Sequence, residues 1–263
     1  MIQEILRPRT VLEAVRMKSG SRAAYLGGGT WLNRLQSDEV TTLISLEQLG
    51  LGRIETAHGR CVIGATASLQ DIVDAPAAPQ AVRAAASLTS SRPMRNMRTM
   101  GGELGQCAPD SALIPVLIAF HAEVSLAGKK KPVPIEQFCK ERPGDLILSV
   151  SVPLVPCAVR AVSRTFHSPR SLVGAVSFKD CRPVLTDVRV VLSDCRGQRV
   201  RLQAVERALE GNALPSKSVI EEWVRAAFMP IADIHASSAC KRYLAGVLAA
   251  DALHAIASGK DAP

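Results

Sequence analysis

Two short segments rich in glycine carry the residues of this sequence that are best suited to bind a ligand. The first glycine segment, residues 26–32, reads Leu-Gly-Gly-Gly-Thr-Trp-Leu, and the second glycine segment, residues 95–103, reads Arg-Asn-Met-Arg-Thr-Met-Gly-Gly-Glu. Glycine lacks a Cβ, so a backbone N–H group in such a segment can approach an anion closely. We predict that the two segments form two walls of one elongated site for a phosphate or a dinucleotide.

The elements around these segments fit this interpretation, although paired glycines most often form a simple turn. A short apolar strand over residues 23–26 runs into the first glycine segment, and such a strand can direct N–H groups toward a diphosphate. After the second glycine segment, Asp110 and Ser111 cap an apolar helix over residues 112–120. The full Gly-x-Gly-x-x-Gly fingerprint is absent from the sequence, so we do not predict a Rossmann domain.

The hydrophobic pattern indicates two regions that meet at a proline break over residues 153–156. Before the break, helices are predicted over residues 9–19, with Thr10 as the capping residue, and over residues 68–73 and 80–88. Strands are predicted over residues 41–46, 122–127 and 145–152, and a hairpin turns at His58 and Gly59. After it, strands are predicted over residues 159–166, 172–178 and 184–192, and helices over 201–210, 216–228 and 239–257. Strands followed by a run of helices indicate a separate α+β unit.

Composition excludes several classes of protein. The chain has 263 residues, of which 47% are hydrophobic and 21% charged, so it is globular. No apolar run reaches the ~18 residues of a membrane span and no signal peptide is present, so we expect a cytoplasmic protein. The net charge of +8 is spread along a chain with only 3% aromatic residues, which argues against nucleic-acid binding.

The cysteines give no sign of a metal site in this chain. There are seven of them, Cys61, Cys107, Cys139, Cys157, Cys181, Cys195 and Cys240, and none is spaced Cys-x-x-Cys. We therefore predict reduced thiols and no metal ligands. The sequence also shows no acid–base pair and no nucleophile beside a base, so no catalytic residue is assigned.

Both glycine segments resemble motifs of one family, the FAD-binding (medium) subunit of the molybdenum hydroxylases, of the xanthine dehydrogenase and carbon monoxide dehydrogenase type. The first is similar to the family's Ala-Gly-Gly-Thr type segment, and the second to its Arg-Asn-x-x-Thr-Ile-Gly-Gly-Asn segment. The resemblance runs from Arg7 and Pro8 through residues 209–211 to residues 241–244. It therefore covers nearly the whole chain.

The resemblance implies an α+β fold in two domains. Residues 1–156 would form a two-part FAD-binding domain of the vanillyl-alcohol-oxidase-like or PCMH type, with subdomains at about residues 1–52 and 53–156. Residues 157–263 would form a small C-terminal flavoprotein domain with a three-stranded antiparallel sheet and helices.

The implied function is that of an oxidoreductase subunit. FAD in this chain would pass electrons from the iron–sulfur clusters of a 2Fe–2S partner subunit, reduced by a molybdenum-cofactor partner subunit, to NAD or another acceptor. The alternative is a docking subunit that has kept the fold and lost the flavin. Glu103 stands where the family has asparagine, and Ala112 where it has aspartate, and both departures favour this alternative.

The resemblance also assigns the residues that bind the cofactor. They are Leu26, Gly27, Gly28, Gly29, Thr30, Trp31, Leu32, Thr99, Gly101, Gly102, Glu103, Gln106, Ser111, Ile147 and Arg160. The first glycine segment would wrap the diphosphate, Ser111 would meet the ribityl hydroxyls, and Arg160 would reach the edge of the flavin ring. Gln106 replaces a threonine of the family.

Overall fold

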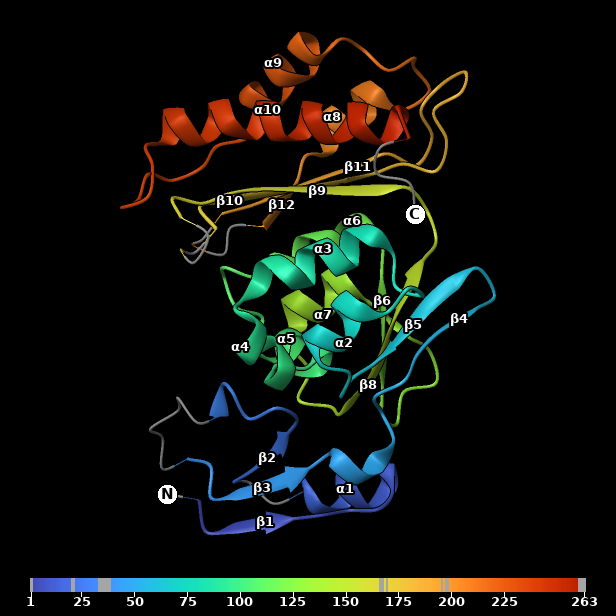
Figure 1. Ribbon diagram of the computed structural model, residues 1–263, viewed down its shortest axis with the longest axis vertical. Helices are drawn as coiled ribbons and strands as arrows, with labels where there is room; N and C mark the ends of the chain where they lie inside the picture. The colour runs from blue at the N-terminus through green and yellow to red at the C-terminus, as the bar shows by residue number, and fades with distance from the viewer. Residues whose placement is uncertain are drawn as a thin grey trace. The chain divides into compact units, whose positions relative to one another are not determined.

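The computed structural model describes residues 2–19, 22–32, 39–165, 168, 170–194, 196 and 199–259. The chain packs into two compact units that interleave along the sequence (Figure 1). The first unit comprises Met1–Ala78, Ser90–Cys107 and Ala122–Val152. The second comprises Pro79–Thr89, Ala108–His121 and Pro153–Pro263.

The first unit begins with a small parallel sheet of strand order β1-β3-β2. Its elements are β1 (Glu4–Leu6), α1 (Val11–Met17), β2 (Ala23–Leu26) and β3 (Thr42–Ser45). Thr10 caps α1 as predicted, because its hydroxyl accepts a hydrogen bond from the N–H of Glu13 at 3.2 Å. Ala14 of α1 packs against Ile44 of β3 in a small apolar cluster, which fixes the position of β2 and of the glycines that follow it.

A five-stranded sheet of order β4-β5-β8-β6-β7 forms the rest of this unit. Its strands are β4 (Ile54–Ala57), β5 (Arg60–Gly64), β6 (Glu123–Leu126), β7 (Val133–Pro134) and β8 (Ile147–Pro153), and its helices are η2 (Glu47–Leu49), α2 (Leu69–Asp74), α4 (Arg92–Met97), α5 (Met100–Gln106) and α7 (Ile135–Glu141). His58 and Gly59 both have positive φ angles, 50° and 71°, as a two-residue hairpin turn requires. The predicted hairpin is confirmed.

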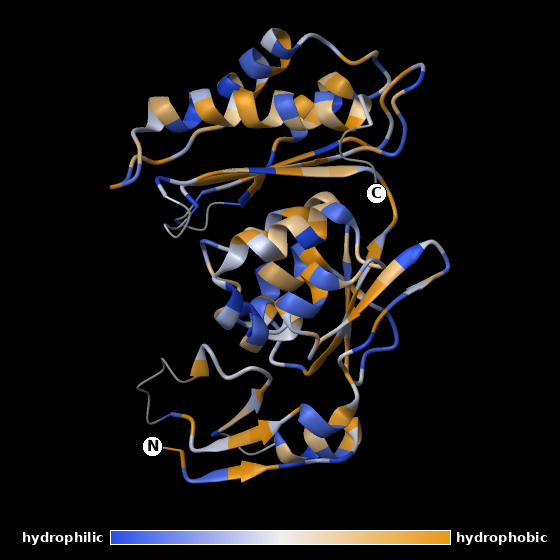
Figure 2. Cartoon of the chain, in the orientation of Figure 1, coloured by the Kyte–Doolittle hydropathy of each residue, from blue (hydrophilic) through white to orange (hydrophobic). Residues whose placement is uncertain are grey.

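The second unit is built on an antiparallel sheet of order β12-β11-β10-β9. Its elements are α3 (Gln80–Thr89), α6 (Leu113–Ala119), β9 (Cys157–Val162), β10 (Leu172–Ser177), β11 (Arg189–Asp194), β12 (Arg199–Arg201), α8 (Gln203–Leu209), α9 (Lys217–Ala227) and α10 (Ser238–Ala257). Figure 1 shows this sheet between α10 on one face and α3 and α6 on the other. Every residue of α6 is buried, and Figure 2 shows its hydrophobic character.

The prediction of three strands in the C-terminal sheet is wrong, because β12 adds a fourth. β12 has only three residues, Arg-Val-Arg, and lies at the edge of the sheet, where it pairs with β11. So short a segment with two charges has no recognisable strand pattern, and its last residue, Arg201, falls within the predicted helix over residues 201–210. Of the predicted strand over residues 159–166, Phe166 lies outside the described residues. Among the helices that the structure describes, none combines the length and the apolar character needed to cross a bilayer.

Candidate functional site

A cavity of about 370 Å³ lies within the first unit. This volume falls in the range of roughly 300–1,000 Å³ that is usual for cofactor and ligand pockets. Most of the predicted site residues line the cavity: Gly27, Gly28, Gly29, Thr30, Trp31, Leu32, Thr99, Gly101, Gly102, Glu103, Gln106 and Ile147. Leu26 is the last residue of β2, directly before the cavity wall. The two glycine segments therefore share one cavity, as the sequence predicts.

The first glycine segment supplies unused backbone donors. β2 pairs in parallel with β3 up to Leu26 and Ser45, and the chain then leaves the sheet through the glycines. Gly29 has a φ of 71°, a conformation that favours glycine. In the part of the chain that is described, the N–H groups of Gly28, Gly29 and Thr30 make no backbone hydrogen bond. They are available to an anionic ligand.

Two glycines of this segment also let the two glycine segments touch. A Cβ on Gly28 would lie 1.4 Å from the carbonyl oxygen of Met97, and a Cβ on Gly27 would lie 2.7 Å from Oγ1 of Thr99. The contact at Gly28 is with backbone and leaves no room for a Cβ, while a Cβ at Gly27 would require the Thr99 side chain to move. Gly27 and Gly28 are therefore needed for the packing that closes one end of the cavity.

The second glycine segment contains the start of a helix. Thr99 is the N-cap of α5, and Gly101 and Gly102 form the first turn of that helix. Their N–H groups are already paired: Gly101 donates to Ala65 O at 2.8 Å, and Gly102 donates to Thr99 Oγ1 at 3.1 Å. Both amides are therefore used within the protein, which the sequence could not show, since the carbonyl of Ala65 comes from a distant strand end. The assignment of Gly101 and Gly102 to the cofactor stays a prediction.

This segment contributes side chains to the cavity wall. Glu103 is 1% exposed, and Nη2 of Arg98 lies 3.2 Å from its Oε2. The same Nη2 donates a hydrogen bond to Oε1 of Gln106 at 3.1 Å. Neither carboxylate oxygen of Glu103 has a hydrogen-bond partner among the described residues. A buried carboxylate normally accepts several hydrogen bonds, so this one is under-satisfied.

The third wall is formed by α7, the connection that follows it and the first residue of β8, Ile147. Sequence reasoning found only Ile147 of this wall. Phe138, Leu146 and Ile147 give it an apolar surface, while Arg142 and Asp145 give it charge. Lys18 also lines the cavity, donates to the carbonyl of Ala23, and lies 5.9 Å from the centroid of the Tyr25 ring. Burial raises the pKa of Tyr25, and the negative charge of Asp145 raises it further.

The cations Lys18, Arg98 and Arg142 line the cavity; Arg98 belongs to the second glycine segment, but no motif could have identified Lys18 and Arg142. The three cations come from the end of α1, the turn before α5 and the end of α7. Lys18 and Arg142, together with the N–H groups of the first glycine segment that have no backbone partner among the described residues, suit a diphosphate. The apolar third wall suits a planar ring. The donor set of the cavity therefore fits a dinucleotide cofactor that carries an aromatic ring.

Two predicted site residues belong to the second unit. Ser111 is buried just before α6, and its hydroxyl accepts a hydrogen bond from the N–H of Ile114 at 3.3 Å. Arg160 lies in β9 opposite Gly174, and its Nη1 donates to Val159 O at 3.0 Å. Their assignment to a cofactor stays a prediction.

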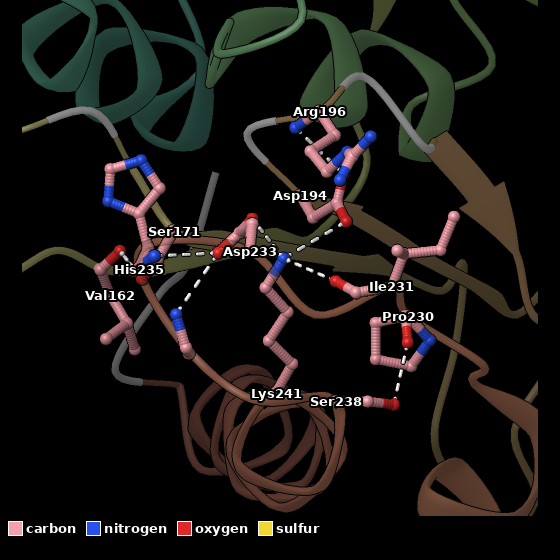
Figure 3. Close-up of polar contacts among 11 residues, drawn as sticks. Val162, Ser171, Asp194, Arg196, Pro230, Ile231, Asp233, His235, Ser238 and Lys241 are labelled. Atoms are coloured by element: carbon pink, nitrogen blue, oxygen red, sulfur yellow. Dashed lines mark hydrogen bonds and ion pairs between the residues drawn. The ribbon is translucent and has the colours of Figure 1, made fainter.

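A second polar cluster surrounds Lys241 in α10 (Figure 3). Its ammonium group is fully buried and donates to Asp233, to Ile231 O at 3.0 Å and to Asp194 at 3.4 Å. Burial alone would lower the pKa of Lys241, but the hydrogen bond to Asp233 and the charges of Asp194 and Asp233 raise it overall. This cluster joins the segment before α10 to the end of β11, and every donor of the ammonium group is used inside the unit.

The thiols and carboxylates show no metal centre. Within the described ranges, no group of three or more His, Cys, Asp or Glu side chains is placed to hold a metal ion. Burial raises the pKa of the Cys61 thiol to about 11, so this thiol stays protonated at neutral pH. Cys195 lies outside the described residues.

Comparisons with known proteins agree with this geometry. Residues 1–155 match the family model described as the FAD binding domain in molybdopterin dehydrogenase. The uncharacterized protein YgfM of Escherichia coli (strain K12) is 34% identical over 258 residues, which are 95% of each chain.

Solved structures share the fold over nearly the whole chain. A chain of the carbon monoxide dehydrogenase from Hydrogenophaga pseudoflava, in a form that lacks the Mo-pyranopterin moiety of the molybdenum cofactor, has a TM-score of 0.85 at 24% identity and 98% coverage of both chains. A chain of quinoline 2-oxidoreductase from Pseudomonas putida 86 has a TM-score of 0.85 at 18% identity, also with 98% coverage of both. At these identities the likeness shows a common fold.

Proposed function

Since this chain belongs to the family of FAD binding domains in molybdopterin dehydrogenases, we propose that it is the FAD-binding electron-transfer subunit of a molybdenum-containing hydroxylase. The observation that carries this proposal is the cavity of the first unit. There, N–H groups of the first glycine segment that have no backbone partner among the described residues, cationic side chains and an apolar wall surround one space. In this proposal, residues 1–156 form the FAD-binding domain and residues 157–263 a C-terminal domain.

The residues of the cavity have separate parts in holding the cofactor. The N–H groups of Gly28, Gly29 and Thr30 would bind the diphosphate, because aligned backbone dipoles stabilise an anion without a titrating group. Phe138 and Ile147 would pack against the flavin ring. The assignment of Ser111 and Arg160 to the cofactor rests on the family resemblance alone. When bound, FAD supplies both single-electron and hydride transfer, so the protein needs no catalytic side chain of its own.

The proposed partners follow from the same family resemblance. A molybdenum-cofactor subunit would oxidise the substrate, and a 2Fe–2S subunit would carry electrons to FAD in this chain. NAD or another acceptor would then take two electrons. The carbon monoxide dehydrogenase and the quinoline oxidoreductase are oxidoreductases by their names, which supports a redox role for this fold.

The test is the flavin content of the purified protein. We expect a yellow protein that releases its flavin on heat denaturation, and a Gly28→Ala variant that loses it because the new Cβ would push Met97 and the second glycine segment away. Gly52→Ala is the matched control, since its Cβ would meet only Thr66 Oγ1 at an ordinary 3.5 Å. Circular dichroism checks that both variants are folded.

A specific observation favours one alternative, a docking subunit without flavin. The carboxylate of Glu103 lies in the cavity wall, where it would repel a phosphate placed beside it. A colourless wild-type protein that cannot be reconstituted with FAD would support this alternative and contradict the proposed function.

A further inference from the structure

We propose that Glu103, together with Arg98 and Gln106, forms a subsite that binds hydroxyl groups, and that it takes the polyol part of the ligand and not its phosphates. This inference rests on the proposed function, because the polyol is then the ribityl chain of the flavin. It gives Glu103 a binding role where the family pattern has asparagine.

The carboxylate of Glu103 lacks hydrogen-bond donors among the described residues. This holds for both of its oxygens, and the residue is 1% exposed. The cation beside it, Arg98, lies at 3.2 Å without hydrogen-bond geometry to it, and donates to Gln106. An unsatisfied buried carboxylate is costly, so donors from a ligand would stabilise it.

A carboxylate recognises ligand groups that donate hydrogen bonds. An asparagine both donates and accepts hydrogen bonds, whereas an ionised carboxylate only accepts. Hydroxyl groups donate, and unesterified phosphate oxygens at neutral pH do not. The pair of Arg98 and Glu103 has no net charge, so this wall offers no attraction to an anion, in contrast to the N–H groups of the first glycine segment. The first glycine segment would therefore contact the anionic part of the ligand, and the wall with Glu103 would contact its hydroxyl-bearing part.

The competing explanation is that the ion pair is only structural. Arg98 follows α4 directly, and Glu103 lies in the first turn of α5, so the pair could simply hold the junction of these two helices. A structural pair predicts a loss of stability without a change in the choice of ligand. A hydroxyl-binding subsite predicts that the effect of the substitution depends on the hydroxyl groups of the ligand.

The experiment couples a change in the protein to a change in the ligand. Apoprotein of the full chain is titrated with riboflavin, with FAD and with a flavin whose N10 side chain is an unsubstituted pentyl group. We expect wild type to prefer riboflavin over the pentyl flavin by about tenfold or more, as hydrogen bonds to a charged group imply. Glu103→Gln should lower the affinities for riboflavin and FAD by a similar factor and leave the affinity for the pentyl flavin unchanged.

Glu55→Gln is the matched control, because Glu55 is an exposed residue of β4 and does not line the cavity. It should change none of the three affinities. Glu103→Asp, which keeps the charge and shortens the side chain, is the second variant should Glu103→Gln fail to fold, and it should also reduce the preference for riboflavin.

Three results would overturn the inference while the proposed function stands. The first is equal wild-type affinity for riboflavin and the pentyl flavin. The second is an equal effect of the Glu103→Gln substitution on the affinities for all three ligands. The third is tighter binding of FAD by Glu103→Gln with unchanged binding of riboflavin, which would place the carboxylate beside a phosphate. Wild-type protein that binds none of the three flavins would overturn the proposed function and this inference together.

Discussion

At the scale of single residues, the two buried charged groups Lys241 and Glu103 differ in whether their hydrogen-bonding capacity is satisfied. Lys241 has all its donors used by groups of its own unit, and Glu103 has no hydrogen-bond donor among the described residues. Removing one partner from a fully paired buried cluster is costly, whereas a buried carboxylate that has a cation beside it but no hydrogen-bond donor costs free energy until a ligand supplies donors. We therefore infer a structural role for Lys241 and a ligand-binding role for Glu103.

Lys241→Met should lower the free energy of unfolding by about 3–5 kcal/mol, because it leaves Asp194 and Asp233 buried without their shared cation. Lys217→Met is the control. Its ion pair with Asp251 is exposed, so a change of about 0–1 kcal/mol is expected. Urea unfolding measures both, and equal effects of the two substitutions would contradict the structural role of the buried cluster.

The same comparison has a defined pH dependence. The pKa of Lys241 is raised in the folded state, so its contribution is complete below the ordinary lysine value of about 10.4 and is lost as the pH rises through the folded pKa. The difference in stability between wild type and Lys241→Met should therefore be constant near neutral pH and shrink only in strongly alkaline solution.

At the scale of the elements, glycines set how closely neighbouring segments approach. Gly27 and Gly28 allow contact with the second glycine segment, and Gly246 does the same for the two long helices of the second unit. A Cβ on Gly246 of α10 would lie 2.9 Å from the carbonyl oxygen of Glu221 in α9. These glycines are needed for packing, although a glycine within a helix lowers its intrinsic stability.

Gly246→Leu should destabilise the protein by about 1–3 kcal/mol, because the larger side chain forces α9 and α10 apart. Gly105→Ala in α5 should have the opposite effect, a gain of up to about 1 kcal/mol, since nothing lies within 4 Å of its Cβ and alanine favours the helix. Thermal unfolding compares the two. A gain in stability from Gly246→Leu would show that the helices are not in close contact there.

At the scale of the whole molecule, the second unit takes two helices, α3 and α6, from the N-terminal part of the chain. All seven residues of α6 are buried, and the hydroxyl of Ser177 in β10 donates to Ala119 O of α6 at 2.6 Å. The unit therefore cannot be completed by residues 157–263 alone. The division of the chain into two domains near residue 156 stays a prediction.

A chain truncated to residues 1–156 tests this arrangement. It would keep the cavity residues of the first unit but leave α6 without the strands that cover it, so we expect a protein that binds a hydrophobic dye and aggregates. The full chain should bind little dye under the same conditions. A truncated chain that is monomeric, binds no dye and unfolds cooperatively would contradict the interleaved packing.

The sequence by itself determined what depends on neighbours along the chain. The cap of α1 at Thr10, the hairpin at His58 and Gly59, the strand that leads into the first glycine segment and the family resemblance all follow from residues a few positions apart, and the structure and comparisons confirm them. The tertiary structure alone decided which backbone groups are free. The amides of Gly101 and Gly102 are occupied by Ala65 and Thr99, the carboxylate of Glu103 is buried, and β12 joins the sheet as an edge strand. Each of these depends on contacts between distant segments, and a local pattern of residues does not encode which distant carbonyl, cation or strand will arrive beside it.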